Sequence, residues 1–177
     1  KRVSGSGAWS LTFAGGAAGI TVTSPNGGET WAVGSARSVT WTYTGDPGPN
    51  VTVELLKGGS LHRTLSASEP IGSGGSGSYA WTIADDLTPA SDYRIRVRST
   101  STSASDTSNA DFTISKAATT TAVAGVAGKI GQTVNLQATL TRDTDNAPLG
   151  SRSIAFQVDG SSAGSSNTNS SGITTRA

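Results

Sequence analysis

The chain has 177 residues, with 13 Lys and Arg against 12 Asp and Glu and a formal net charge of +1, so no overall charge attracts it to nucleic acid or acidic membranes. It contains no Cys, which excludes disulfides, thiolate zinc sites and a cysteine nucleophile. No apolar run approaches the roughly 18 residues that a membrane-spanning helix needs.

The composition favours strands over helices. The chain has 23 Gly and many Ser and Thr, residues that suit short strands and turns, and no window has apolar residues at i, i+3, i+4 and i+7. We therefore expect an all-β fold. Low charge, absent Cys and a Ser/Thr/Gly-rich surface are typical of secreted bacterial proteins, so we expect an extracellular or cell-surface location. Because the chain starts at Lys1 without a signal peptide, we also expect a piece of a longer modular protein.

Residues 1–19 hold one predicted strand, Ala8–Phe13, in which Trp9, Leu11 and Phe13 alternate with polar residues. A lone strand is not stable. We therefore expect it to be the terminal strand of an upstream unit, or to pair with another copy, with the Gly/Ala-rich remainder acting as a linker.

Residues 20–115 are predicted to form one complete β-sandwich. Strand-like runs occur at Ile20–Thr23, Ser38–Thr44, Val51–Lys57, Leu61–Leu65, Ser78–Ile83, Tyr93–Arg98 and Asp111–Ser115. About seven short strands with turn signals between them are typical of such a sandwich. We expect its core to gather around four aromatic side chains, those of Trp41, Trp81, Tyr93 and Phe112, each able to bury ~150–250 Å².

A second, partial module is predicted at residues 120–177, after a short linker at 116–119. Its predicted strands are Thr120–Val126, Thr133–Arg142 and Ser153–Asp159, and another begins near Ile173. A small sandwich needs about seven strands. The fold class is therefore predicted as tandem immunoglobulin/fibronectin-like β-sandwiches, the second incomplete, which is either cut short or completed by neighbouring copies.

A series of motifs carries a family resemblance in the first module. In order, they are Ser24-Pro25-Asn26-Gly27-Gly28-Glu29-Thr30-Trp31, Val39-Thr40-Trp41, Val53-Glu54-Leu55-Leu56-Lys57, Tyr79-Ala80-Trp81-Thr82-Ile83, Asp92-Tyr93-Arg94-Ile95-Arg96-Val97 and Phe112-Thr113-Ile114. Through them, residues 20–115 resemble the Ser/Thr-rich GPI-anchored fungal cell-wall family module, which also occurs in bacterial secreted proteins. The resemblance implies an immunoglobulin- or fibronectin-like sandwich without established catalytic residues.

Two further resemblances lie outside this module. Residues 119–177 resemble bacterial immunoglobulin-like repeats of surface and secreted proteins, through Gly131-Gln132-Thr133-Val134 and Val158-Asp159-Gly160. Residues 8–13 are similar to the last strand of the P-domain found behind secreted subtilisin-like proteases. That likeness implies a secreted peptidase with C-terminal accessory modules as the parent protein.

Catalytic and metal-binding patterns are sparse. His62 is the only histidine, there is no Gly-x-Ser-x-Gly elbow, and a histidine metal site normally uses more than one His or a Cys. No Asp-x-Asp-x-Asp calcium loop occurs, and no glutamate lies in a glycosidase motif. We interpret His62 as a solvated strand residue and the aspartates as turn and cap residues. We therefore expect no cofactor, no metal and no enzyme activity in this segment.

Five residues are candidates for a ligand or partner surface: Trp9, Trp31, Arg94, Arg96 and Arg98. The three arginines form an outward-facing ladder that suits an anionic polymer or a partner edge; the alternative is cross-strand pairing with an acidic residue such as Glu54. The two tryptophans lie outside the alternating core set and suit stacking on sugar rings. Burial under the turn at 25–28 is the alternative for Trp31.

The leading hypothesis is a non-catalytic structural, spacer or interaction segment of a secreted or cell-surface modular bacterial protein. One alternative is a carbohydrate-binding accessory module of a secreted hydrolase or peptidase. Another is a fibre-forming subunit, in which the strand at 8–13 of one copy adds to the open sheet edge of another. The expected partners are neighbouring domains, other copies or polysaccharide, without nucleic acid or membrane insertion.

Overall fold

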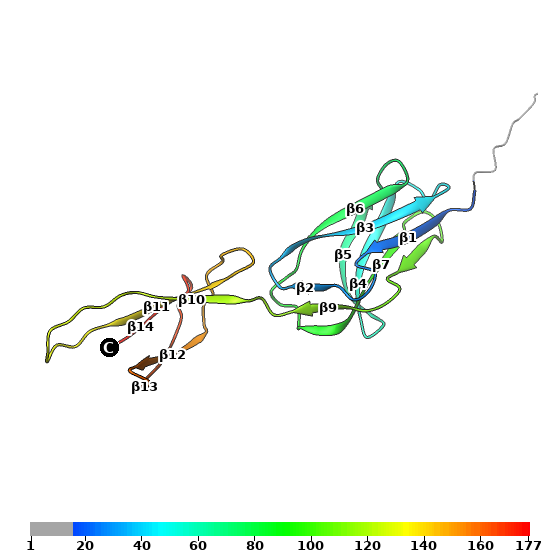
Figure 1. Cartoon of the computed structure of the whole chain (residues 1–177). Helices are drawn as coiled ribbons and strands as arrows, with labels where there is room; N and C mark the ends of the chain where they lie inside the picture. Colours follow the sequence, from blue (N-terminus) through cyan, green and yellow to red (C-terminus); the bar gives the residue numbers. More distant parts are fainter. Residues whose placement is uncertain (1–15) are drawn as a thin grey trace, which may run out of the picture. The chain divides into compact units, whose positions relative to one another are not determined.

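The computed structural model describes residues 16–177, which form fourteen strands and their connecting loops (Figure 1). This confirms the predicted all-β class. The predicted strand at 8–13, with Trp9, lies outside the described residues. No helix with the length and apolar character to cross a membrane occurs in the described part of the chain.

The chain packs as two compact units. Among the described residues, the first contains 16–27, 38–79 and 94–111, and the second contains 28–37, 80–93 and 112–177. Each unit therefore combines segments that are distant in the sequence.

A three-stranded sheet joins β1 (Gly19–Ser24), β3 (Ala36–Thr44) and β6 (Ser76–Thr82) in the order β1-β3-β6. β1 and β3 are antiparallel, with Val22 opposite Trp41. Both side chains are buried, and the Trp41 indole N–H donates to the Ile71 carbonyl at 3.0 Å. The alternate residues of both strands are mostly Thr and face outward, as the period of two predicts.

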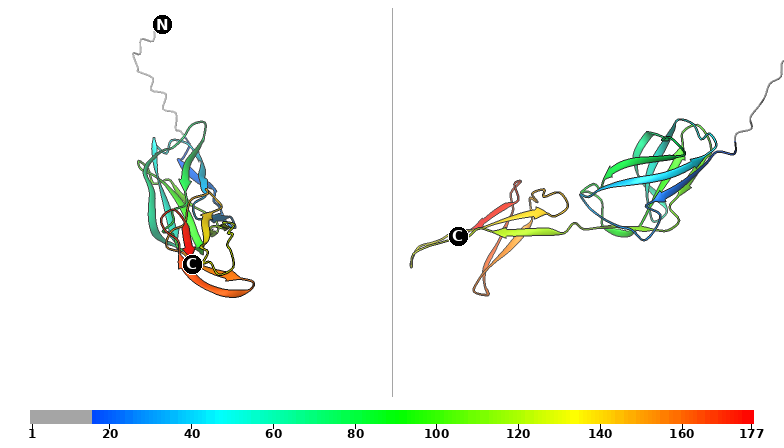
Figure 2. Two further views of the ribbon diagram at one scale, coloured as in Figure 1. Left: turned by 90° about the vertical axis from the view of Figure 1, so that its left-hand side faces the viewer. Right: turned by 45° about the horizontal axis from the view of Figure 1, so that its top comes forward.

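The larger sheet contains six strands. They are β2 (Thr30–Ala32), β4 (Asn50–Lys57), β5 (Ser60–Pro70), β7 (Ala90–Ser99), β8 (Ser105–Thr107) and β9 (Phe112–Ser115). The order is β2-β9-β7-β4-β5, with β8 paired to β7. β2 runs parallel to β9, while β5 lies at an edge and pairs with β4 through three register shifts. Figure 2 shows this sheet facing the three-stranded one. Both sheets contribute buried apolar side chains to the core, such as Val39 and Trp41 from β3 and Val53 and Ile95 from the larger sheet.

The alternation predicted on β7 is confirmed. Tyr93, Ile95 and Val97 have no exposed surface, and the arginines between them face outward. The Tyr93 hydroxyl donates to the carbonyl of Thr88, five residues upstream, at 2.7 Å. This bond is the tyrosine corner of immunoglobulin-like sandwiches.

Aromatic rings form a continuous cluster in the second unit. The Trp31 ring centroid lies 6.0 Å from that of Trp81 and 5.3 Å from that of Phe112, and Phe112 lies 6.1 Å from Tyr93. These are ordinary distances for edge-on and tilted aromatic pairs. The cluster holds the short strand β2 against β9.

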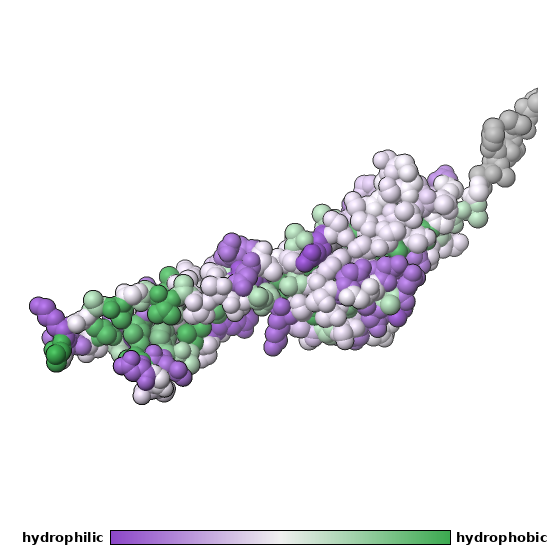
Figure 3. Space-filling model, viewed as in Figure 1, coloured by the Kyte–Doolittle hydropathy of each residue, from purple (hydrophilic) through white to green (hydrophobic). Residues whose placement is uncertain are grey.

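The remaining strands form two small sheets with a thin core. β10 (Thr119–Val123), β11 (Leu136–Arg142) and β14 (Ile173–Arg176) pair in the order β10-β11-β14, and β12 (Ser153–Val158) pairs with β13 (Ser161–Asn167). The buried apolar side chains among residues 119–177 are those of Ala138, Leu140 and Phe156. Four large apolar residues are exposed: Val123, Val126, Ile130 and Val158. Figure 3 shows apolar surface over this part of the chain.

Candidate functional site: an arginine cleft in the second unit

Arg142, the last residue of β11, is buried against a carboxylate. The whole residue is 8% exposed. Its Nε donates to Asp145 Oδ1 at 2.9 Å and its Nη2 to Asp145 Oδ2 at 2.6 Å, which is the bidentate geometry that makes Arg–carboxylate pairs strong. A backbone hydrogen bond in the turn holds the Asp145 carboxylate in position for this pair, since the Ala147 N–H also donates to Asp145 Oδ1 at 3.0 Å.

A second carboxylate reaches Arg142 from another segment. Nη1 of Arg142 donates to Asp85 Oδ1, although the two residues are 57 positions apart. Asp85 lies in the loop between β6 and β7, and its side chain is 68% exposed. The three nitrogen atoms of the guanidinium are therefore all engaged by carboxylates.

Gly34 makes the close approach of a third segment possible. A Cβ atom at this position would lie 2.5 Å from the guanidinium carbon of Arg142, and the Gly34 φ of +79° favours glycine. The Gly34 N–H donates to the Ile83 carbonyl at 2.8 Å, which fixes the turn beside the Asp85 loop. The turn at 32–35, the loop at 84–86 and the end of β11 thus converge on one guanidinium.

The ion pairs keep both partners charged. The hydrogen bonds from Arg142, helped by the Ala147 N–H, lower the pKa of Asp145 to about 2. The hydrogen bond to Asp145 raises the pKa of Arg142 above its usual value, although burial acts in the opposite direction. Neither group changes charge near neutral pH, so the cluster has a structural rather than an acid–base character.

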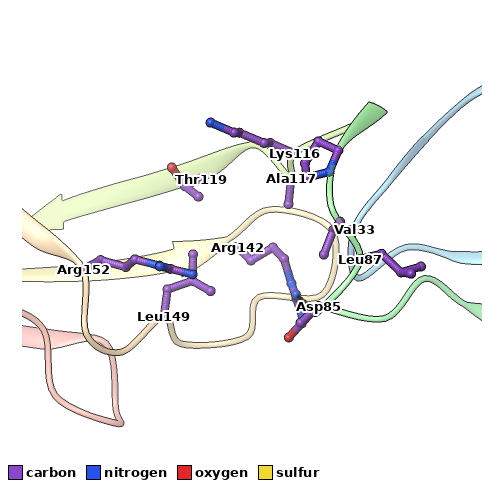
Figure 4. Close-up of a pocket in the computed structure, with 10 residues that line it drawn as sticks. Val33, Asp85, Leu87, Lys116, Ala117, Thr119, Arg142, Leu149 and Arg152 are labelled. Carbon is purple, nitrogen blue, oxygen red and sulfur yellow. Dashed lines mark hydrogen bonds and ion pairs between the residues drawn. The ribbon is translucent and has the colours of Figure 1, made fainter. Parts of the chain in front are cut away.

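A cleft of about 430 Å³ lies beside this cluster, and all of its lining residues belong to the second unit. Its lining residues are Val33, Asp85, Leu87, Pro89, Lys116, Ala117, Thr119, Arg142, Leu149 and Arg152. Figure 4 shows the Arg142 side chain directed at Asp85 and the Arg152 guanidinium lying beside Leu149. The lining combines an apolar wall with three cationic side chains.

The arginine ladder predicted as a ligand surface lies mostly in ion pairs. Nε of Arg94 is 2.5 Å from Asp111 Oδ1, and Nε of Arg96 is 2.6 Å from Glu54 Oε2. Glu54 is a buried residue, so the pair with Arg96 satisfies a carboxylate that would otherwise be costly to bury. Arg98 is exposed at the end of the ladder.

The candidate tryptophans do not form an exposed platform in the described residues. Trp31 is 6% exposed and packs in the aromatic cluster, and Trp41 and Trp81 are also buried. Trp9 lies outside the described residues. Sugar stacking on Trp31 would therefore require the core around it to open.

Several of the aspartates, which the sequence suggests are turn and cap residues, have structural partners. Asp106 accepts the Val22 N–H at 2.8 Å, while Asp111 and Asp85 accept hydrogen bonds from arginines. Among residues 16–177, no group of three or more His, Asp or Glu residues is placed to hold a metal ion. His62 is exposed on β5.

Comparison with known proteins gives one family match. Residues 24–114 match the family described as the Kre9/KNH-like N-terminal Ig-like domain. No curated protein sequence matches this chain.

Several solved structures are similar to this chain. The fibronectin(III)-like modules of Clostridium thermocellum CbhA share 18% identity, covering 88% of this chain and 77% of theirs, with a TM-score of 0.32. The titin domains Z1Z2, solved in complex with telethonin, share 17% identity over 89% of this chain and 79% of theirs, with a TM-score of 0.39. DIP-gamma IG1+IG2 shares 12% identity over 89% and 82%, with a TM-score of 0.33. At these TM-scores the fold assignment rests on the strands and the tyrosine corner described above.

Proposed function

Because the chain belongs to the family of Kre9/KNH-like N-terminal Ig-like domains through residues 24–114, we propose that it is a non-catalytic structural segment of a secreted or cell-surface modular protein. In this role it spaces neighbouring domains and presents them to their partners. An immunoglobulin-like sandwich suits such a role because its rigid sheets carry load and its loops remain free to interact.

The observation that carries this proposal is the cluster around Arg142. It joins the turn at 32–35 and the loop at 84–86 to the end of β11, and these segments lie on either side of the predicted linker at 116–119 in the sequence. The backbone of this region is also restrained, since the Asp143 N–H donates to the Ala118 carbonyl at 2.9 Å. A spacer benefits from such contacts because they limit motion around the linker.

The ion pairs resist disruption because Arg142 is buried. Removing a carboxylate partner is costly because it leaves the charge of the Arg142 side chain, which is 10% exposed, with less compensation. The exposed position of Asp85 lowers its share of this cost. Asp145, with two hydrogen bonds to the guanidinium, contributes more.

Arg142→Gln tests this proposal. Loss of the bidentate pair is expected to raise amide hydrogen exchange at residues 116–119 and 84–86 by about tenfold or more, while β4 and β7 keep their protection. The measurement is hydrogen exchange followed by mass spectrometry on the whole chain. Lys129→Gln is the matched control, because it removes an exposed positive charge of the same unit outside the cleft. Unchanged exchange at 116–119 in Arg142→Gln would contradict the spacer role of the cluster.

A further inference from the structure

The inner face of the sheet β10-β11-β14 is only partly covered. Val123 on β10 pairs directly with Ala138 on β11, which pairs with Thr174 on β14, so the three side chains lie on the same face. Ala138 is 1% exposed, whereas Val123 is 69% exposed. Thr174 is buried, and its Oγ1 has no hydrogen-bond partner among the described residues. Because a buried hydroxyl without a partner is costly, this interior is incomplete within the described chain.

β12 has a free edge and a partly covered apolar row. In the described part of the chain it pairs with β13 alone. The side chains of Ile154, Phe156 and Val158 alternate with exposed residues, and Phe156 is buried while Val158 is 50% exposed. The register shift of this pair falls on β13, where Ala163 is the additional residue. The alternation of β12 is therefore uninterrupted.

The free edge of β12 lacks the features that normally prevent strand addition. Charged side chains, Pro and bulges on the edge strand are the usual protections. β5, at the edge of the larger sheet, has register shifts and ends at Pro70. β12 contains neither Pro nor a charged residue. Its edge is therefore able to accept a further strand.

Residues 8–13 supply a matching strand sequence within this chain. They lie outside the described residues, and their alternation predicts a strand of six residues, the length of β12. The apolar side chains of Trp9, Leu11 and Phe13 have the same spacing as the apolar row of β12. No charged residue occurs at positions 3–15, so adding this strand buries no charge.

The predicted donor strand is tethered closely to the first unit. Two residues separate Phe13 from Gly16, and the backbone of Gly16 and Ala17 lies so close to Gly45 that a Cβ atom at Gly45 would collide with it. β12 belongs to the second unit. The donor and the acceptor edge therefore belong to different units of one chain, which suits a head-to-tail contact between copies.

We propose that residues 8–13 of one copy add to the free edge of β12 in a second copy by β-augmentation. The backbone groups of the edge form the pairing, and the apolar side chains of the added strand cover Phe156 and Val158. Each copy has one donor strand and one acceptor edge, so the contact is heterologous and repeats into open chains or rings. This partner goes beyond the spacer role, because it joins separate molecules.

Self-association of the 177-residue chain, followed by sedimentation velocity over a wide range of micromolar concentrations, tests the proposal. We expect species larger than the monomer to grow with concentration. Leu11→Asp places a charge in the apolar row of the donor and Val158→Asp in that of the acceptor, so each should weaken association by at least about tenfold. Thr12→Asp and Gln157→Asp are the matched controls, because alternation places the same charge on the opposite face of each strand, and both should associate normally.

Mixing the two blocked variants separates loss of binding from loss of folding. Leu11→Asp keeps the acceptor edge, and Val158→Asp keeps the donor strand. We expect their equimolar mixture to form a one-to-one dimer and no longer species. A wild-type chain or a mixture that stays monomeric, or equal weakening by Leu11→Asp and Thr12→Asp, would overturn the proposal. The spacer role is tested through Arg142→Gln at residues 116–119, so the two proposals fail independently.

Discussion

Asp145 and Asp85 hold the same guanidinium but differ in their surroundings. The Asp145 side chain is 36% exposed and makes two hydrogen bonds to Arg142, while the Asp85 side chain is 68% exposed and makes one. The nearby Asp145 pair is local, three residues along the chain, and the turn fixes it. The Asp85 bond joins distant segments and depends on the fold. The cluster therefore has a local anchor and a longer-range contact.

The lowered pKa of Asp145 predicts an acid-sensitive contribution to stability. Its folded pKa of about 2 lies below its ordinary value near 3.9. The contribution is therefore complete above about pH 4 and is lost as the pH falls toward 2. In Asp145→Asn, the unfolding midpoint should be lower at neutral pH and should fall less between pH 4 and 2. Thermal unfolding across this range measures it, with Asp143→Asn as the control. Equal acid dependence in wild type and Asp145→Asn would refute it.

Sequence reasoning located some of these residues and missed others. The sequence offered pairing of the arginine ladder with Glu54 as the alternative to a ligand surface. This alternative could be named because strand alternation predicts which side chains lie on the same face of a sheet. The contact between Arg142 and Asp85 was not predicted, since no local pattern joins residues 57 positions apart. The local signal was the spacing of Arg142 and Asp145 around a turn. It indicates an ion pair but reveals neither Asp85 nor the cleft.

Strands of regular alternation were predictable, and short or irregular ones were not. β7 has a clean period of two, so its inward and outward faces followed from the sequence. β2 and β8 have three residues each, too few for a periodic signal. β5 extends to Pro70 beyond the predicted end at residue 65, because its register shifts against β4 interrupt the alternation.

The tyrosine corner predicts a measurable stability difference. Tyr93→Phe removes the hydroxyl that donates to the Thr88 carbonyl while keeping the buried ring, so we expect a loss of about 1 kcal/mol in the free energy of unfolding. Tyr43→Phe is the matched comparison, because the Tyr43 hydroxyl makes an exposed 3.3 Å bond to the Gly72 carbonyl. Urea unfolding of both variants measures the difference. An equal effect in the two variants would argue against a special role for the corner.

At the scale of the whole molecule, apolar burial is uneven along the sequence. The strands of residues 19–115 bury a dense core, including Val39, Val53 and Ile95 without exposed surface. Residues 119–177 bury three apolar side chains and expose four large ones. The predicted division at 116–119 and the predicted likeness of the later residues to bacterial immunoglobulin-like repeats stay predictions. The uneven burial itself has a physical consequence that can be measured.

We expect residues 119–177 to open more readily than the core sandwich. Burial of apolar surface supplies most of the free energy that protects backbone amides from exchange. The amides of β11 and β12 should therefore exchange at least about tenfold faster than those of β4 and β7 in the wild-type chain. Hydrogen exchange with fragment resolution measures both sets together. Equal protection would show that contacts other than apolar burial stabilise the later strands.

The irregular pairing of β5 with β4 affects whether other molecules can add strands to this edge of the sheet. A long, flat edge strand invites other chains to extend the sheet, and such growth ends in aggregates. The three register shifts of β5 against β4, together with Pro70 at its end, bend the edge and interrupt its row of hydrogen-bonding groups. Many copies packed side by side along β5 would then remain separate molecules instead of fusing into a common sheet.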